Sequence, residues 1–596
     1  MHVIATAGHV DHGKSTLVRA LTGSDPDRLA EERQRGLTIS LGYCWTELAG
    51  VGEVAFVDVP GHERFLATML SGVGPVPAVL FVVAADDGWM PQAAEHLAAL
   101  DAFGVQHGVV AVTRSDLADP APAAQRAVAE LARTTLRGAP VVAVSGRTGD
   151  GLPALRDALA RLAAAQPPAN PSADVRLWVD RRFTVRGAGT VVTGTLPAGT
   201  ISCGDELAVG ADLVRVRGVE ALGKSRQRVS GVARVALNLG SKAPEAVENH
   251  SVLVTPEAWH WTTSADVALG SSGPGPTRAD LMLHIGATAE HVHVRELGAQ
   301  HARLLFRRPL PLRVGDRAIL RDPGSRRLWG VVVADPVPPP IDRRGAASRR
   351  AAVLAEVDGR PDATDELHRR KIVQASLLRR IGVNPDTTAA VHAGDWLLDP
   401  EHAAVLRSRL ADQVAAKSRE DPLDPTLPLV AAAHLLELPS PDLVAALVQP
   451  PLQLSQGRIL TSGTSLPPDL LHAIARVTER LRVHPYRAPE AEELAAAGLD
   501  RRALAAAERA QLIVRLTDTV VLLPGADESA ARLLAELPQP FTTSAARRHL
   551  DTTRRVVIPL LERLDRSAHT RRLPDDRRTT IDPPRQRDRD HDRDAH

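Results

Sequence analysis

The chain has 596 residues, which is too long for one hydrophobic core and predicts at least about four domains. Apolar residues make up 44% of the chain and charged residues 24%, which excludes a disordered or fibrous protein. The formal net charge is only +1, so any binding of polyanions must depend on local basic patches.

The sequence predicts no membrane segment and no secretion. No apolar run approaches the roughly 18 residues of a membrane-spanning helix, and the first strand begins too early to leave room for a signal peptide. The two cysteines, Cys44 and Cys203, form neither a CxxC pair nor a disulfide framework. We therefore expect a cytoplasmic protein.

The segment Gly8–Ser15 lies between the apolar strand Val3–Ala5 and the helical segment Thr16–Leu21. Strand, glycine-bounded loop and helix in this order are typical of a phosphate-binding P-loop. Its N–H groups would converge on phosphate oxygens at a helix start. Lys14 is expected to reach the β and γ phosphates and Ser15 to bind Mg²⁺. The remaining residues predicted on this side of the nucleotide are Gly8, His9, Val10, Asp11, His12, Gly13 and Thr16.

Two later segments complete the phosphate side. Thr38 ends the charged segment Asp25–Ile39 and is predicted to close over Mg²⁺ as a switch. The alternative for this segment is a plain surface helix ending at Gly36. A second apolar strand ends at Asp58, which would hold the Mg²⁺ shell, and the N–H of Gly61 would sense the γ-phosphate.

His62 follows this Asp-x-x-Gly motif directly and is the candidate catalytic residue. An imidazole at this point is placed to orient the attacking water. A purely structural histidine is the alternative.

The base side of the predicted site follows two further strands. Asp116 ends an apolar strand, where it would accept two hydrogen bonds from guanine that adenine does not offer. The usual pattern there is Asn-Lys-x-Asp, whereas this chain has Thr113 and Arg114. Arg114 is expected to stack its flat guanidinium on the base. Ser145 and Gly146 supply the last base loop, with glycine where alanine is usual.

With these motifs, residues 1–170 resemble an α/β P-loop GTPase domain of the elongation factor Tu type. The segments Gly61–Phe65 and Met90–Leu97 are most similar to the selenocysteine-specific elongation factors. The resemblance implies that GTP is hydrolysed to GDP and phosphate on the ribosome. It also implies that Val10 and Leu37 form an apolar gate flanking His62.

Two β-barrel domains are expected after the proline-rich linker Gln166–Ser172, over residues 174–255 and 256–337. The string Gly187–Leu196 resembles the second-domain signature of translational GTPases. The resemblance places a selenocysteine pocket in the first of them and a tRNA contact in the second. The pocket residues it implies are Asp180, Arg181 and Arg234.

Charge supports such a pocket, because a selenol is ionised at neutral pH and a serine hydroxyl is not. Fixed cations would therefore favour selenocysteine over serine. The alternative for Asp180-Arg181 is a solvated strand end. In addition, Glu248–His250 departs from the Arg-Gly turn that is usual near the end of this domain.

The last third is helical, with short strand pairs, and predicts an array of about four winged-helix domains. Their expected bounds are 341–420, 421–465, 466–538 and 539–580. Residues 581–596 are expected to be a disordered tail, because the part after Ile581 alternates arginine and aspartate and lacks apolar residues for a core.

The last winged helix carries ten arginines against five acidic residues between Phe541 and Arg578. Basic side chains at the start of its second helix suit phosphate contacts on an RNA hairpin. A solvated charged face is the alternative, but the resemblance implies binding of the messenger hairpin that recodes UGA. The candidate contacts are Arg547, Arg554, Arg555, Arg571 and Arg572.

The leading hypothesis is a monomeric GTPase that uses GTP/GDP and Mg²⁺ to deliver selenocysteinyl-tRNA to ribosomes at hairpin-marked UGA codons. Two alternatives stay open. One is a general aminoacyl-tRNA or ribosome-rescue factor. The other is an RNA-binding regulator with a decayed nucleotide site, which Thr113, Arg114 and Gly146 suggest.

Overall fold

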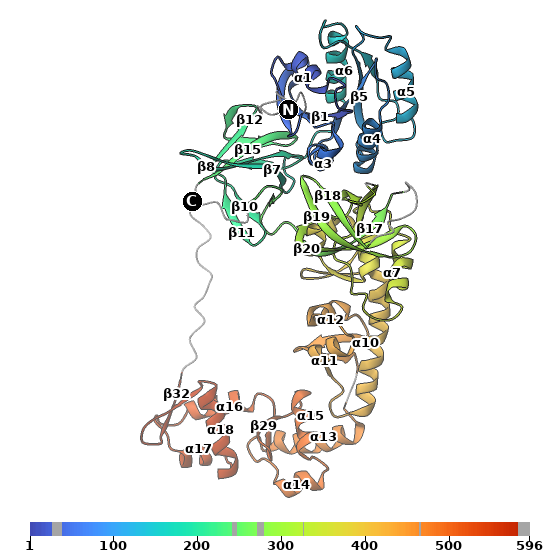
Figure 1. Ribbon diagram of the computed structural model, residues 1–596. Coiled ribbons are helices and arrows are strands. Elements are labelled where there is room, and N and C mark those ends of the chain that lie inside the picture. The colour runs from blue at the N-terminus through green and yellow to red at the C-terminus, as the bar shows by residue number, and fades with distance from the viewer. Residues whose placement is uncertain (27–37, 241–246, 271–278, 326, 464–465, 582–596) are drawn as a thin grey trace. The chain divides into compact units, whose positions relative to one another are not determined.

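The computed structural model describes residues 1–26, 38–240, 247–270, 279–325, 327–463 and 466–581. It divides into two compact units, Met1–Ala389 and Ala390–His596 (Figure 1). Leu37, most of the expected switch segment and most of the expected tail fall outside the described residues. Within these ranges, no helix is both long and apolar enough to span a bilayer.

A six-stranded sheet is the centre of the first domain, in the order β2-β3-β1-β4-β5-β6 among the described strands. Only β2 runs antiparallel to its neighbour. All seven residues of β4 are buried, because helices cover both faces of the sheet. The strands are β1 (His2–Gly8), β2 (Gly42–Leu48), β3 (Gly52–Asp58), β4 (Ala78–Ala84), β5 (His107–Thr113) and β6 (Val141–Ala143).

The helices of this domain fall into two layers. α3, α4 and α5 share one core with the sheet, whereas α1 and α6 pack on its other face. This confirms the expected α/β P-loop domain and places the loop before α1 at the carboxyl end of β1. The helices are α1 (Lys14–Thr22), the short η1 (Glu63–Phe65), α3 (Leu66–Val73), α4 (Pro91–Phe103), α5 (Ala121–Leu131) and α6 (Leu152–Ala164).

The first β domain consists of two sheets around one core. Eight described strands pair in the order β11-β10-β16-β7-β8-β15-β12-β13, and β9 pairs with β14. Side chains of both sheets, such as Val192 and Ile201, enter the same hydrophobic cluster. Among the described strands, hydrogen bonds do not close one ring. The strands are β7 (Arg176–Val185), β8 (Gly189–Leu196), β9 (Thr200–Ser202), β10 (Glu206–Val209), β11 (Asp212–Arg215), β12 (Gly218–Ala221), β13 (Lys224–Arg226), β14 (Arg228–Ser230), β15 (Ala233–Gly240) and β16 (Val252–Val254).

The second β domain is a closed barrel in the order β17-β20-β19-β18-β21-β22. Strand β17 pairs with both β20 and β22, which removes free sheet edges. The strands are β17 (Trp261–Leu269), β18 (Asp280–Ile285), β19 (Thr288–Glu296), β20 (His301–Pro311), β21 (Arg317–Arg321) and β22 (Leu328–Asp335).

A buried ion network fastens the next helices to this barrel. Arg350 of α7 donates to Asp266 and Asp335, both at 2.6 Å, and both carboxylates are fully buried. Arg369 and Arg370 of α8 also donate to Asp335. Although burial favours its neutral form, the arginines hold the pKa of Asp335 well below its usual range. The elements are α7 (Ala346–Leu354), α8 (Ala363–Arg370), β23 (Ile372–Gln374), α9 (Ala375–Arg380) and η2 (Pro385–Thr387).

The second unit combines helices with two-stranded hairpins. Within the described residues it has the hairpins β24–β25, β27–β28, β29–β30 and β31–β32, each of the kind that forms the wing of a winged helix. The long helix α10 contacts α12 and β28, so it packs on the elements that follow it. The elements through β28 are β24 (Val391–Ala393), β25 (Trp396–Leu398), α10 (Pro400–Glu420), β26 (Leu427–Pro428), α11 (Leu429–Leu435), α12 (Pro441–Leu447), β27 (Leu452–Ser455) and β28 (Arg458–Thr461).

The last two winged helices share a single hydrophobic core, which extends from Leu466 to Leu564. They therefore form one packed body rather than separate beads. Their elements are α13 (Pro468–Val483), α14 (Ala491–Ala496), α15 (Arg501–Arg509), β29 (Val514–Thr517), β30 (Val520–Leu522), α16 (Ala526–Ala535), α17 (Thr543–His549), α18 (Arg554–Arg566), β31 (Thr570–Arg572) and β32 (Arg578–Thr580).

Candidate functional site

A cavity of about 750 Å³ opens where the parallel strands of the first domain end. Leu17, Arg19, Asp25, Leu117 and Arg147 also line it and were not predicted. Of the predicted nucleotide-binding residues, Gly8, His9, His12 and Asp58 lie outside its lining, as does the predicted catalytic residue His62. The predicted nucleotide residues that do line it are Val10, Asp11, Gly13, Lys14, Ser15, Thr16, Gly61, Thr113, Arg114, Asp116, Ser145 and Gly146.

The loop between β1 and α1 has the backbone of a phosphate cradle. Gly8, Asp11 and Gly13 all have positive φ, of 132°, 62° and 82°. A Cβ on Gly8 would lie 2.1 Å from the carbonyl oxygen of Val82, so only glycine fits there. No side chain caps α1, which leaves the N–H groups of its first turn for an anion.

Gly61 packs directly against this loop. A Cβ on Gly61 would lie 2.4 Å from Lys14 Nζ and 2.5 Å from the backbone nitrogen of Val10. Lys14 Nζ itself donates to the carbonyl oxygens of Gly8 and His9, at 3.2 and 2.7 Å. The ammonium therefore lies inside the cradle, between the P-loop and the turn after β3.

The three predicted Mg²⁺ ligands come together beside the cavity. Ser15 Oγ donates to Asp58 Oδ2 at 2.6 Å and lies 3.0 Å from Thr38 Oγ1. The Thr6 hydroxyl donates to the other oxygen of Asp58, also at 2.6 Å, and fixes the carboxylate. Clustered hydroxyl and carboxylate oxygens are the donor set that a hard cation requires, so these residues fit Mg²⁺.

His62 lies at the start of η1, where its Nδ1 accepts a hydrogen bond from the N–H of Arg64 at 3.2 Å. Its ring lies 6.1 Å from that of Phe65. In the neutral ring Nδ1 is thus the acceptor, and Nε2 carries the proton. Of the two predicted gate residues, Val10 lines the cavity and Leu37 is outside the described residues.

Thr113 and Arg114 connect the end of β5 to the P-loop and to Asp86. The Thr113 hydroxyl donates to the carbonyl oxygen of His12 at 2.7 Å, which joins the base loop to the P-loop. The Arg114 guanidinium donates to both carboxylate oxygens of Asp86, at 3.1 and 2.9 Å, and to the carbonyl oxygen of Asp11. Arg114 lines the cavity while its fork is held by Asp86.

The remaining base-side residues lie as predicted at the ends of β5 and β6. A hydrogen bond from Ser145 lowers the pKa of Asp116, so this carboxylate is ionised at neutral pH. Arg147 Nε lies 3.5 Å from the same carboxylate. A Cβ on Gly146 would be in ordinary contact with Thr16, at 3.4 Å, so the usual alanine would fit and its absence does not reshape the cavity.

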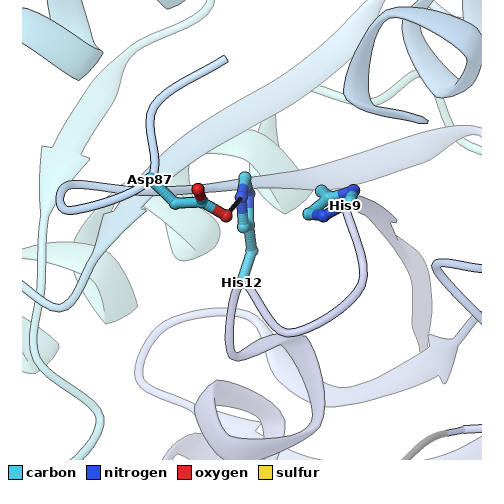
Figure 2. Close-up of side chains that lie close together, drawn as sticks. All are labelled: His9, His12 and Asp87. Atoms are coloured by element: carbon cyan, nitrogen blue, oxygen red, sulfur yellow. Dashed lines mark hydrogen bonds and ion pairs between the residues drawn. The ribbon is translucent and has the colours of Figure 1, made fainter. Parts of the chain in front are cut away.

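His9, His12 and Asp87 gather behind the P-loop (Figure 2). The spacing resembles a metal site, but the hydrogen bonds argue against one. His12 Nδ1 accepts from the N–H of Ala84 at 3.2 Å, so Nε2 carries the proton and donates to Asp87 at 3.3 Å. Metal-binding histidines instead donate through their second nitrogen. Burial lowers the pKa of His12 to about 4, so this neutral ring serves as a clamp on the loop.

Asp86 and Asp87 were missed in the sequence analysis. They follow β4 at its carboxyl end and hold the base loop and the P-loop respectively. Two acids directly after a buried parallel strand were the signal that would have found them.

The predicted pocket residues of the first β domain meet beside the GTPase domain. Arg234 donates through both Nη atoms to Asp180, at 2.7 Å for Nη2, and the pair is buried. The guanidinium carbon of Arg234 lies 3.8 Å from the ring centre of Tyr43 on β2. Arg181 donates to the carbonyl oxygen of Leu41 at 2.9 Å. A cavity of about 280 Å³, lined by Tyr43, Asp180 and Arg181 among others, adjoins this cluster.

The five arginines predicted to contact the RNA hairpin differ in the partners of their side chains. The side chains of Arg547, Arg554 and Arg571 make no hydrogen bond or ion pair with the part of the chain that the structure describes, and Arg554 and Arg571 are exposed. Arg572 forms an exposed ion pair with Asp576. These four side chains are available for phosphates.

Arg555 is engaged within the protein. Its guanidinium donates to the carbonyl oxygens of Ala488, Pro489 and Thr519, at 3.1, 2.6 and 3.2 Å. Its Nε lies 3.3 Å from the Glu490 carboxylate. The side chain therefore ties α18 to the preceding winged helix.

The sheet, the P-loop, the oxygen cluster and the carboxylate of Asp116 together define a P-loop protein of the GTPase class. The family model "Elongation factor Tu GTP binding domain" matches residues 1–165. Elongation factor Tu 2 of Streptomyces avermitilis is 35% identical over 280 residues, which cover 42% of this chain and 72% of that protein. The chain belongs to the elongation factor Tu family of translational GTPases.

Other similarities concern one branch of that family. The model "Elongation factor SelB, winged helix" matches residues 532–579. Selenocysteine-specific elongation factors of Desulfomicrobium baculatum and Escherichia coli are 36% and 39% identical over 336 and 353 residues. These alignments cover 54% and 58% of this chain, and the chain spans about half the length of these relatives, 53% and 56%.

A solved structure agrees in fold over nearly the whole chain. The crystal structure of a bacterial selenocysteine-specific elongation factor, EF-Sec, matches with a TM-score of 0.74 and 23% identity, and the match covers 98% of this chain and 100% of that one. The expected fold, a P-loop GTPase domain followed by β domains and winged helices, is confirmed.

Proposed function

We propose that this protein delivers selenocysteinyl-tRNA to the ribosome at UGA codons marked by an mRNA hairpin, and that it hydrolyses GTP there. One observation carries the proposal. A single chain joins a GTP-binding domain of the elongation factor Tu type, residues 1–165, to a winged helix that matches the SelB model, residues 532–579. In this proposal the protein acts as a monomer in the cytoplasm.

The nucleotide chemistry follows from the donors in the cavity. Lys14 contacts the β and γ phosphates, and Asp116 selects guanine through its ionised carboxylate. Ser15, Thr38 and Asp58 would hold Mg²⁺, which would neutralise phosphate charge when bound. His62 orients the attacking water through its Nε2–H, because its Nδ1 already accepts a hydrogen bond.

The proposed preference for selenocysteine over serine depends on charge. Arg181 lines a cavity between the GTPase domain and the two β domains, and the Arg234 guanidinium is buried nearby on Asp180, which also lines that cavity. An ionised selenol gains from this field and a neutral serine side chain does not. Asp180 holds Arg234 in place for this role.

The proposed binding of the mRNA hairpin depends on arginines of the last winged helix whose side chains have no partner among the described residues. Arg554 at the start of α18, together with Arg547 and Arg571, contacts hairpin phosphates. Because these side chains have no protein partner among the described residues, RNA binding does not have to break an ion pair.

Binding of two charged tRNAs tests the function. The GTP-bound protein is titrated with selenocysteinyl-tRNA and with seryl-tRNA of the same sequence. We expect at least about tenfold tighter binding of the selenocysteine form. Equal affinities would refute the specificity.

A general aminoacyl-tRNA factor is the second candidate, which the match to elongation factor Tu 2 favours. It predicts an effect on translation that does not depend on the hairpin. A regulator with a decayed nucleotide site would fail to bind GTP at micromolar concentration or to discriminate against ATP.

A further inference from the structure

A second large cavity of the first unit, of about 580 Å³, lies where the closed barrel leads into α7 and α8. It shares no lining residue with the nucleotide cavity of the GTPase domain. Its volume lies in the range of small-molecule sites, which is roughly 300–1,000 Å³. Its lining contains one acidic residue, Asp342, and four arginines, Arg343, Arg349, Arg350 and Arg369. The cavity is therefore strongly basic.

Arg350 is the most deeply placed of these arginines. It is 6% exposed, and its Nε and Nη2 donate to Asp266 and Asp335, both at 2.6 Å. Its Nη1 makes no hydrogen bond to any residue that the structure describes. A guanidinium N–H in such a place costs free energy unless an acceptor reaches it. Nη1 of Arg350 thus needs an acceptor from outside the chain, and the cavity gives one access.

The ion network behind the cavity carries more positive than negative charge. Arginine stays protonated in proteins, and the arginines hold the pKa of Asp335 well below its usual range. A surplus positive charge in a largely buried network is costly without a counter-charge. An anion in the adjoining cavity would supply it. The ion pairs join four arginines to three carboxylates, namely Arg303, Arg350, Arg369 and Arg370 to Asp266, Asp335 and Glu366.

Arg343 and Arg349 add positive charge on the exposed side of the cavity. Both side chains are exposed and make no hydrogen bond or ion pair with the described residues. A Cβ on Gly345 would lie 3.2 Å from Arg349 Nη1, so this guanidinium lies beside the start of α7. No side chain caps the first turn of α7, which also favours an anion. Guanidinium groups in this number suit a phosphate, which accepts paired hydrogen bonds from them.

The rest of the cavity wall includes apolar side chains. Pro340, Ile341 and Val353 line it, and Val353 is 41% exposed. Inorganic phosphate would leave this apolar surface in water, whereas the carbon skeleton of an organic phosphate would cover it. An RNA backbone contacts a protein through surface side chains, but those of Arg350 and Arg369 are only 6% and 8% exposed. The wall therefore favours a small organic phosphate over RNA.

We propose that this cavity is a second binding site, for a small organic phosphate of about the size of a nucleotide. Its phosphate contacts Arg343, Arg349 and Nη1 of Arg350, and its carbon skeleton packs on the apolar wall. Because the lining includes residues of α7 and Arg369 of α8, the bound molecule stabilises the attachment of these helices to the barrel. The site is independent of the proposed delivery of selenocysteinyl-tRNA.

The test titrates the full-length protein, saturated with GDP, with adenosine 5′-monophosphate in a calorimeter. We expect a dissociation constant on the order of 10–100 μM and a raised melting temperature of the first unit. Arg343→Gln and Arg349→Gln should each weaken binding about tenfold, because each removes a charged hydrogen-bond donor. The matched control Arg344→Gln changes the neighbouring exposed arginine, which does not line the cavity, and should change the affinity less than about twofold. Since none of the three side chains has a partner among the described residues, all three variants should keep the wild-type melting temperature without ligand.

Four results would overturn the proposal. The first is no saturable binding of adenosine 5′-monophosphate up to about 1 mM. The second is equally tight binding of adenosine or of inorganic phosphate, because then either the phosphate or the carbon skeleton is not recognised. The third is an equal loss of affinity in Arg344→Gln. The fourth is a loss confined to RNA, in which Arg343→Gln and Arg349→Gln weaken binding of an RNA oligonucleotide but not of the monophosphate; these arginines would then belong to an RNA surface.

Discussion

Arg554 and Arg555 are neighbours at the start of α18, and the structure predicts opposite consequences for their loss. Arg555 makes three hydrogen bonds to backbone carbonyls of the preceding winged helix, at 2.6 to 3.2 Å. The Arg555 side chain is 28% exposed, so water compensates in part for the hydrogen bonds that Arg555→Ala removes. Each of these bonds therefore contributes at most about 1 kcal/mol to the free energy of unfolding. The total is about 2 kcal/mol.

That loss has a measurable size because the last two winged helices share one core. For a cooperative body of this size, about 2 kcal/mol lowers the melting temperature by roughly 8 °C. Arg554 has no partner among the described residues, so Arg554→Ala should change stability by less than about 0.5 kcal/mol. It should instead remove one phosphate contact, which weakens hairpin binding about eightfold at 0.1 M salt.

The assay measures both variants by thermal unfolding and by hairpin titration at several salt concentrations. For Arg554→Ala, the slope of log affinity against log salt should fall by about one and GTP affinity should not change. A lowered slope together with an unchanged melting temperature in Arg555→Ala would show that Arg555 contacts RNA and would refute the packing role. An unchanged slope in Arg554→Ala would remove it from the RNA interface.

Three further predictions concern the first unit. His62→Ala should keep GTP affinity and lose ribosome-stimulated hydrolysis; unchanged hydrolysis on ribosomes would contradict its assigned role. Thr113→Val should weaken GDP binding about tenfold in a fluorescent-nucleotide titration, because the buried carbonyl of His12 loses a 2.7 Å hydrogen bond, whereas Thr113→Ser should bind normally. Asp335→Asn should lower the free energy of unfolding of this unit by about 3–5 kcal/mol in chemical denaturation, because several buried arginines lose their counter-charge. The control Asp342→Asn, on the surface, should leave the free energy of unfolding unchanged. Since the pKa of Asp335 is held far below its unfolded value of about 3.9, its contribution is fully present above about pH 4 and is lost only in stronger acid.

The sequence alone was enough to predict the residues of the proposed nucleotide site, because the chemistry of that site is local. The loop Gly8–Ser15 needs positive φ and free N–H groups within a few residues, and glycine spacing encodes both. Asp58 and Asp116 were found in the same way, since each ends an apolar strand and parallel strands end at one edge of a sheet. The closed barrel and the terminal hairpins also followed from short-range alternation of apolar residues.

Tertiary structure decided what depends on distant partners. No sequence pattern around Arg555 distinguishes it from Arg554. Packing nevertheless directs the Arg555 side chain to the preceding winged helix and leaves Arg554 exposed. In the same way, only the fold brought Tyr43 onto Arg234, 191 positions later in the chain, and Asp86 onto Arg114. The physical reason is that backbone conformation is set by near neighbours, whereas the partner of a charge is set by which elements pack against it.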